Sequence, residues 1–124
     1  MKGREKSPQE LRILARLRKI CLALPEVTEA VDGFGHTSFR VGKKPIAMMG
    51  SQELHLAIKA DPVTQEAQVR AGRYKRTPFL GQHGWVSVAD FDQLDWAEIE
   101  ELVSDAYRRT APKRLLAKPE SRPR

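Results

Sequence analysis

The chain has 124 residues, of which 40% are apolar and 31% are charged, a composition typical of one globular domain rather than of a disordered segment. A single cysteine excludes an internal disulfide framework, and the sequence contains neither a signal peptide nor an apolar run long enough to span a bilayer, so we expect a cytoplasmic protein. The formal net charge of +6 is concentrated at the two ends: residues 1–20 carry seven bases against two acids, and residues 108–124 carry seven against one.

The first predicted element is a helix that begins near Pro8. Ser7 suits the N-cap, Pro8 suits the first helical position, and Glu10 completes a capping box. An apolar stripe follows at three- and four-residue steps, formed by Leu14, Leu17, Cys21 and Leu24. Pro25 ends the helix, and we interpret Cys21 as a packing residue of its apolar face.

Between residues 37 and 58 the apolar period changes from helical to two. Residues 37–41 alternate as a half-buried strand, residues 42–45 form a turn, and residues 46–49 return as a second strand. After a further turn, Leu54, Leu56 and Ile58 share one face of a third strand. The pattern predicts a three-stranded antiparallel meander with one apolar face.

A second helix is predicted from Asp61-Pro62 to Gly72, followed by an irregular loop over 73–84 and a short strand over 85–88. Asp95 begins a last helix with an apolar side that includes Trp96. We therefore predict an α+β fold, a two-layer α/β sandwich in which the N- and C-terminal helices cover one face of an antiparallel sheet. The predicted domain spans 8–117, between a basic extension at 1–7 and a tail at 118–124 that we expect to be disordered.

Several segments together resemble the MmcQ/YjbR family over roughly residues 11–117. They are 24–27, 35–42, Lys59 with Asp61-Pro62, 79–86 (FLGQHGWV), 94–96, 105–108 and 111–115. The resemblance implies a compact α/β fold similar to the frataxin-like and phage MotA C-terminal architectures, described as a double wing. It also implies DNA binding, with no catalytic residue set that can be mapped here. The basic extensions are additions to the family pattern.

The residues themselves also favour nucleic-acid binding. Four bases and an aromatic lie close together, a combination that can neutralise phosphates while the ring stacks: Arg70, Arg73, Tyr74, Lys75 and Arg76. The predicted hairpin tip adds Lys43 and Lys44, and the polar sheet face adds Arg40 and Lys59. The alternative interpretation is a solvated loop near a helix C-terminus and a turn with ordinary lysines.

The charge along the chain predicts two electrostatically different sides. Residues 40–76 hold eight bases against three acids, whereas residues 90–105 hold seven acids and no base. We expect a non-enzymatic DNA-binding protein that acts electrostatically, with weak sequence specificity and no cofactor or metal. We expect no membrane partner. The oligomeric state is left open, with a monomer favoured.

Two other interpretations remain open. Trp85 alternates with the apolar Val86, so it would point to the open sheet face near Arg40 and His55, where a small ligand or a protein partner could bind. His36 and His83, with Asp32, could support acid–base chemistry or a metal if the fold brought them together, but no nucleophile or phosphate-loop motif accompanies them. An iron-handling role would need the acidic segment 90–105 as an exposed ridge.

Overall fold

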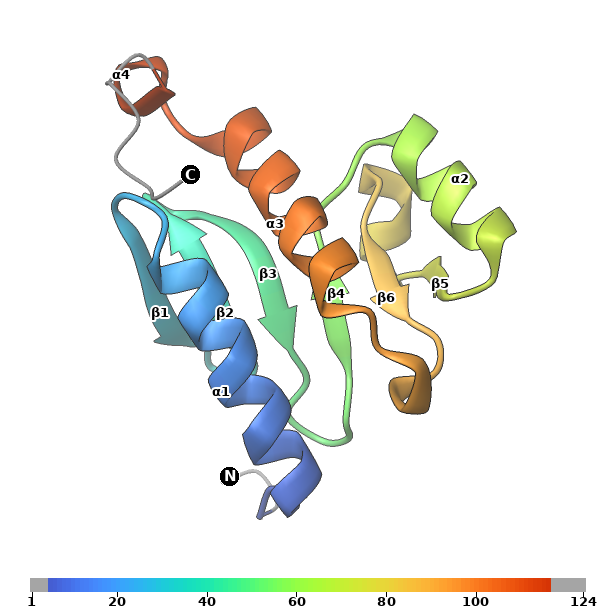
Figure 1. Cartoon of the computed structure of the whole chain (residues 1–124). Coiled ribbons are helices and arrows are strands. Elements are labelled where there is room, and N and C mark those ends of the chain that lie inside the picture. Colours follow the sequence, from blue (N-terminus) through green and yellow to red (C-terminus); the bar gives the residue numbers. More distant parts are fainter. Residues whose placement is uncertain (1–4, 117–124) are drawn as a thin grey trace.

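The computed structural model describes residues 5–116, which form one six-stranded sheet with helices packed against it (Figure 1). All neighbouring strands are antiparallel, in the order β1-β2-β3-β4-β6-β5. The strands are β1 (Val27–Val31), β2 (Thr37–Val41), β3 (Lys44–Met49), β4 (Leu56–Ile58), β5 (Tyr74–Arg76) and β6 (Val86–Val88). The helices are α1 (Pro8–Leu22), α2 (Pro62–Ala71), α3 (Trp96–Thr110) and α4 (Lys113–Leu116), with 3-10 turns η1 (Leu80–His83) and η2 (Phe91–Gln93). Most of the predicted N-terminal extension and all of the predicted tail lie outside the described residues.

The three long helices begin where their capping signals predict. The Glu10 amide donates to Ser7 Oγ at 3.1 Å while the Ser7 amide donates to Glu10 Oε1 at 3.2 Å, which completes the capping box of α1. Asp61 accepts the Thr64 amide at 2.7 Å at the start of α2, and Asp95 caps α3 in the same way. Each cap satisfies an amide that the helix itself leaves without a partner. None of the helices in the described part of the chain has the length and apolar character needed to cross a bilayer.

The helices form a second layer on one face of the sheet. α1 lies against β1 and β2, and α3 crosses β3 and β4 (Figure 1). Leu17, Phe39, Ile99 and Val103 are fully buried between the two layers, and Cys21 lies among them as predicted. α2 packs against β5 and β6 at the far end of the sheet. The predicted two-layer α+β sandwich, with helices covering one face of an antiparallel sheet, is confirmed.

The sheet is wider than predicted because two strands carry little apolar pattern. β1 places Glu29 opposite Phe39 on the helix-covered face, where Arg18 donates to both of its carboxylate oxygens at 2.7 and 2.9 Å. An ion pair at a core-facing position breaks the alternation that identifies a strand from sequence. The predicted loop 73–84 was wrong in part, since it contains β5, a three-residue edge strand with two cations, and the turn η1.

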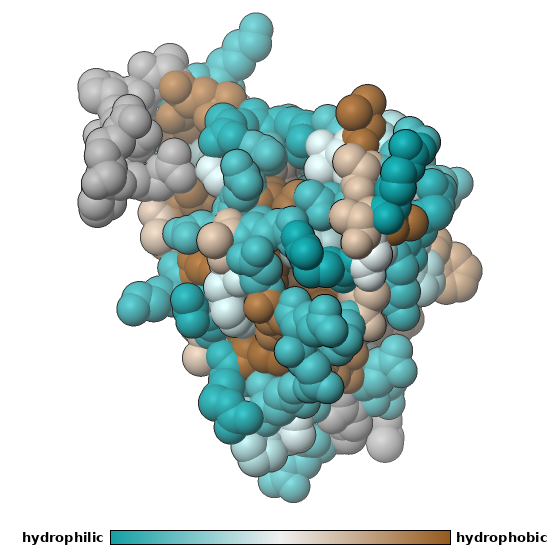
Figure 2. All heavy atoms as spheres, turned by 45° about the vertical axis from the view of Figure 1, so that its right-hand side comes forward, coloured by the Kyte–Doolittle hydropathy of each residue, from teal (hydrophilic) through white to brown (hydrophobic). Residues whose placement is uncertain are grey.

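Gly84 is required where the chain leaves η1. Its φ is 92°, and a Cβ at this position would lie 2.6 Å from the carbonyl oxygen of Ala60. Gly72, which ends α2, also has a positive φ, of 94°, but a Cβ there would meet open space. The close approach at Gly84 holds the start of β6 against the link between β4 and α2. Figure 2 turns the α2 side of the molecule forward, and there polar side chains cover most of the surface while apolar atoms show in a hollow between them.

Candidate nucleic-acid interface

The strand registers assign each side chain of the sheet to one of two faces. Partners across an antiparallel ladder share a face, and one row of partners crosses all six strands. It consists of Ala30, Ser38, Met48, Ala57, Ser87 and Lys75. Phe39 and Val86 alternate with this row along their strands and lie in the core, so the row faces away from α1 and α3. We call the face that carries this row the open face.

Small side chains form the floor of the open face. Ser38, Ala57 and Ser87 are at most 2% exposed because the larger side chains beside them shield them. One of these is Arg40, whose Nε donates to Ser38 Oγ at 2.8 Å, so that the guanidinium lies along the sheet. Arg40 was predicted from the sequence, whereas the floor was not, although the alternation within residues 37–41 already indicated the direction of Ser38.

Three cations predicted as nucleic-acid contacts lie on the open face. Arg40 is in β2 opposite Thr28 and Pro45, and Lys75 is in β5 opposite Ser87. Lys59 follows β4 two residues after Ala57, so it shares the face of that residue. In the strands of the described chain, no position that faces this side is acidic. The open face therefore has a single sign of charge along its strands.

The hairpin between β2 and β3 extends this positive surface. Lys43 and Lys44 are both exposed at its tip. Neither they nor the three cations of the open face form an ion pair with any residue that the structure describes. On the helix-covered side, by contrast, Arg18 and Arg109 are both paired with acids, Arg109 with Asp61 at 3.3 Å. The bases of the open face are thus available to an external anion.

A chain of hydrogen bonds on the open face connects the residue before β4, the middle of β6 and the residue after β5. His55 Nε2 lies 2.7 Å from Ser87 Oγ, which lies 2.8 Å from Thr77 Oγ1. Burial lowers the pKa of His55; Glu53 acts to raise it, and Lys75 and His36 contribute to lowering it. The Ser87 hydroxyl is wholly buried and shared between two partners. This geometry suits a structural connection between β4, β6 and β5.

The predicted basic cluster at 70–76 is divided between different surroundings. Arg70 is on α2 and pairs with Glu66 at 2.9 Å, one helical turn away. Arg73 donates to both carboxylate oxygens of Glu98 in α3, at 3.1 and 2.9 Å. Two of the four bases thus have acid partners, one of which comes from a distant part of the sequence.

The three residues of β5 alternate between the two faces of the sheet. Tyr74 is 5% exposed and lies in the core, and burial raises the pKa of its hydroxyl further above the usual value, with help from Glu98. Its ring is therefore not presented for stacking on a base. Arg76 donates to Gln65 Oε1 at 2.7 Å and to the Gly81 carbonyl at 3.3 Å on the helix-covered side. Of the predicted cluster, Lys75 is the residue on the open face.

Trp85 does not present its ring as the alternative interpretation requires. It is 4% exposed, and β3 and β4 lie between its strand and β2, which carries Arg40. His55 is half-buried, and its Nε2 is hydrogen-bonded to Ser87. The ligand face inferred from these two residues therefore lacks an accessible aromatic surface.

The predicted histidine group is only partly assembled. Asp32 Oδ2 lies 3.1 Å from His36 Nδ1, and Asp32 Oδ1 accepts hydrogen bonds from the amides of Phe34 and His36. Burial, the largest single influence, acts to raise the pKa of Asp32, but these hydrogen bonds together outweigh it and the pKa is lowered. His83 is in η1, next to Gly84 and the end of β4, whereas His36 is near the start of that strand. No group of three or more His, Cys, Asp or Glu side chains suited to a metal ion occurs within residues 5–116.

Comparison with known proteins defines the class. The YjbR family model matches residues 22–109, which include the whole sheet, and the chain belongs to this family. The fold is similar to the crystal structure of Deinococcus radiodurans protein DR2400, described as a DUF419 domain, with a TM-score of 0.64 and 24% identity over 76% of this chain and 75% of that one. A search of curated proteins gave no match.

Proposed function

We propose that this YjbR-family chain binds DNA through its open face, without catalysing a reaction. The observation that carries the proposal is the set of cations Arg40, Lys59 and Lys75, which form no ion pair within residues 5–116, on a sheet face without acidic strand positions. Lys43 and Lys44 at the hairpin tip extend the contact. Four of the seven acids in residues 90–105 belong to α3, on the helix-covered side of the sheet, so charge favours one orientation of the complex.

The chemistry of the face fits phosphate contact better than base recognition. Cations that neutralise phosphates release condensed counterions, and this term dominates binding without sequence preference. In the strands of the described chain, no position that faces this side carries an aromatic ring for stacking on a base. We therefore expect affinity that depends steeply on salt and weakly on sequence.

The test is a fluorescence-anisotropy titration of labelled duplex DNA at several salt concentrations. The triple variant Arg40→Ala/Lys59→Ala/Lys75→Ala removes three cations from the open face. Its matched control, Arg12→Ala/Lys19→Ala/Lys113→Ala, removes the same charge from exposed positions on α1 and α4. If each open-face cation contacts one phosphate, the slope of log affinity against log salt falls by about 2 to 3 in the first variant.

Equal losses in the two variants would mean that net charge rather than the open face governs binding. No binding by the unaltered protein in low salt would exclude the function itself. A third comparison uses the chain trimmed to 8–117: loss of all affinity on trimming would assign binding to the basic ends.

A further inference from the structure

The outer edge of β5 has unpaired backbone groups. β5 is the last strand of the sheet and pairs only with β6. The Thr77 amide donates to the Trp85 carbonyl and the Arg73 carbonyl accepts from Ala89, so the odd-numbered residues of this stretch bond toward β6. The N–H and C=O groups of Tyr74 and Arg76 consequently point away from the sheet. Within residues 5–116, no hydrogen bond outside the ladder satisfies them.

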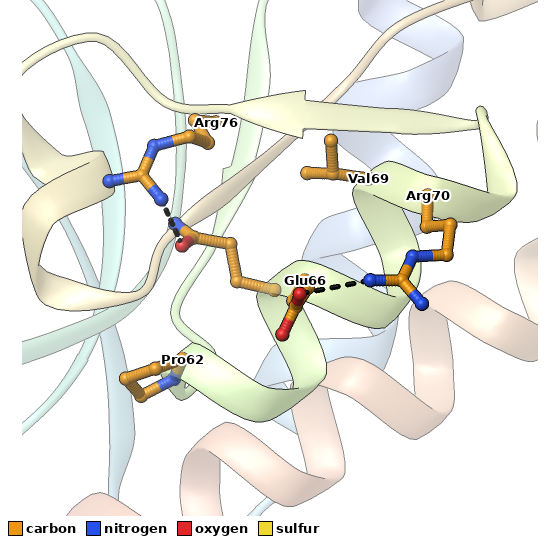
Figure 3. A pocket seen from close by; sticks show the side chains of 6 residues that line it. Pro62, Glu66, Val69, Arg70 and Arg76 are labelled. Atoms are coloured by element: carbon orange, nitrogen blue, oxygen red, sulfur yellow. Dashed lines mark hydrogen bonds and ion pairs between the residues drawn. The ribbon is translucent and has the colours of Figure 1, made fainter.

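A groove runs between this edge strand and α2. Its volume is about 530 Å³, and its walls are formed by Pro62, Gln65, Glu66, Val69, Arg70 and Arg76. Figure 3 shows the Val69 side chain directed from α2 toward β5, with Pro62 at the other end of the helix. An unpaired strand edge beside a groove that can take alternate side chains is the arrangement in which proteins bind an extended peptide by strand addition.

The charges around the groove disfavour a basic occupant, and Lys75 on the other face of the edge strand favours an acidic one. The Arg76 guanidinium is held in place by Gln65 and Gly81, so its charge is fixed at the wall. Arg70 pairs with Glu66, but the two side chains are 78% and 72% exposed, and such a pair contributes little and yields readily to a new partner. Lys75 lies on the opposite face of the same strand, and no acid within residues 5–116 forms an ion pair with it.

We infer that the groove binds an extended segment of a partner protein in which acidic and apolar side chains alternate, added to the sheet as a strand beside β5. The backbone groups of Tyr74 and Arg76 bond to the backbone of the segment. Its apolar side chains enter the groove against Val69, and its acidic side chains, on the other face, meet Lys75. The amide ladder requires a peptide, and Lys75 favours acidic side chains on the face that it shares with them.

The probe is a fluorescent, acetylated and amidated peptide of alternating aspartate and valine, about ten residues long. With the full chain, we expect saturable binding by anisotropy and slower hydrogen exchange of the Tyr74 and Arg76 amides by NMR. Val69→Glu places a charge in the groove and should weaken binding by about tenfold or more. The control Val63→Glu makes the same change on the same helix at a side chain that is 79% exposed and does not line the groove, and it should leave affinity unchanged.

Several results would overturn the inference. They are equal binding of a lysine–valine peptide, unaltered exchange at Tyr74 and Arg76, and equal effects of the two glutamate variants. If N-acetylaspartate alone reproduces the spectral changes without amide protection, the groove holds a small anion and not a strand. The exchange measurement needs no variant, so it decides the question even if Val69→Glu fails to fold.

The inference shares Lys75 with the proposed DNA interface and no other residue. Val69 is on the helix-covered side, so Val69→Glu should leave DNA affinity intact. Replacement of Arg40 and Lys59 should leave peptide binding intact. Either activity can therefore fail without the other.

Discussion

Gln65 connects α2 to the turn that precedes β6, and its replacement by methionine tests this connection. The side chain is 4% exposed, and its Nε2 donates to the Gly81 and Trp85 carbonyls at 2.8 and 2.9 Å. Its Oε1 accepts from Arg76 at 2.7 Å. Gln65→Met keeps an unbranched side chain of similar size and removes all three hydrogen bonds.

The expected loss follows from these contacts. Each bond to a backbone carbonyl contributes about 1 kcal/mol, and the bond from a charged guanidinium about 1.5 kcal/mol or more. The Trp85 carbonyl keeps the Thr77 amide at 3.3 Å, and the Gly81 carbonyl keeps Arg76, so neither is left without a partner. We expect the free energy of unfolding to fall by about 3 kcal/mol, which for a domain of this size lowers Tm by about 10 °C.

Urea unfolding followed by tryptophan fluorescence measures this loss directly. Gln68→Met is the control, because Gln68 is on the same helix, is half-buried and forms no side-chain hydrogen bond within the described residues. A loss below about 1 kcal/mol for Gln65→Met, or one equal to that of the control, would refute the assignment of these bonds as stabilising.

Three further changes have definite expected outcomes. Gly84→Ala should destabilise by clearly more than the roughly 1 kcal/mol expected for Gly72→Ala, because both force a side chain to positive φ but only Gly84 lacks space for a Cβ; paired urea curves compare them. The hydrogen bond from Arg18 holds the pKa of Glu29 below its usual range. The stability that this pair contributes is therefore complete above the pKa of the unfolded state, about 4.3, and is lost as the pH falls through the lower pKa of the folded state. Glu29→Gln should therefore flatten the acid side of the stability profile, and an unchanged profile would contradict the pairing. Burial raises the pKa of Cys21 to about 12, so a thiol reagent at pH 8 should label native protein only at the rate of unfolding, and fast labelling without denaturant would show that the thiol is reachable.

The helices were predictable because their signals are local. Ser7, Asp61 and Asp95 each stand one residue before a helix, and the structure shows each of them capping it. The strand over 37–41 was predictable because its apolar residues alternate toward a single core. β1 and β5 lack that alternation and are defined by pairing with β2 and β6, which no single segment of sequence reveals.

The candidate interface was predictable only in part, because linear proximity does not give the direction of a side chain. Residues 70–76 form a dense basic cluster in sequence. Its members lie at the end of α2 and in and beside β5, so their side chains point in different directions. Glu98, which pairs with Arg73, is separated from it by 25 residues. Arg40, Lys59 and Lys75, far apart in sequence, share one face because the strand order and registers bring their strands into one sheet.

The hydrogen-bond chain from His55 to Thr77 has a polarity. A hydroxyl has one hydrogen to donate, so Ser87 cannot donate to both of its neighbours. When neutral His55 accepts at Nε2, Ser87 donates to it and Thr77 donates to Ser87. Protonation makes Nε2 a donor, and the hydrogen of Ser87 is then released to point to Thr77. The proton on one imidazole nitrogen, at the residue before β4, thus decides whether the Ser87 hydroxyl on β6 has to donate to His55 or can donate to Thr77, the residue after β5.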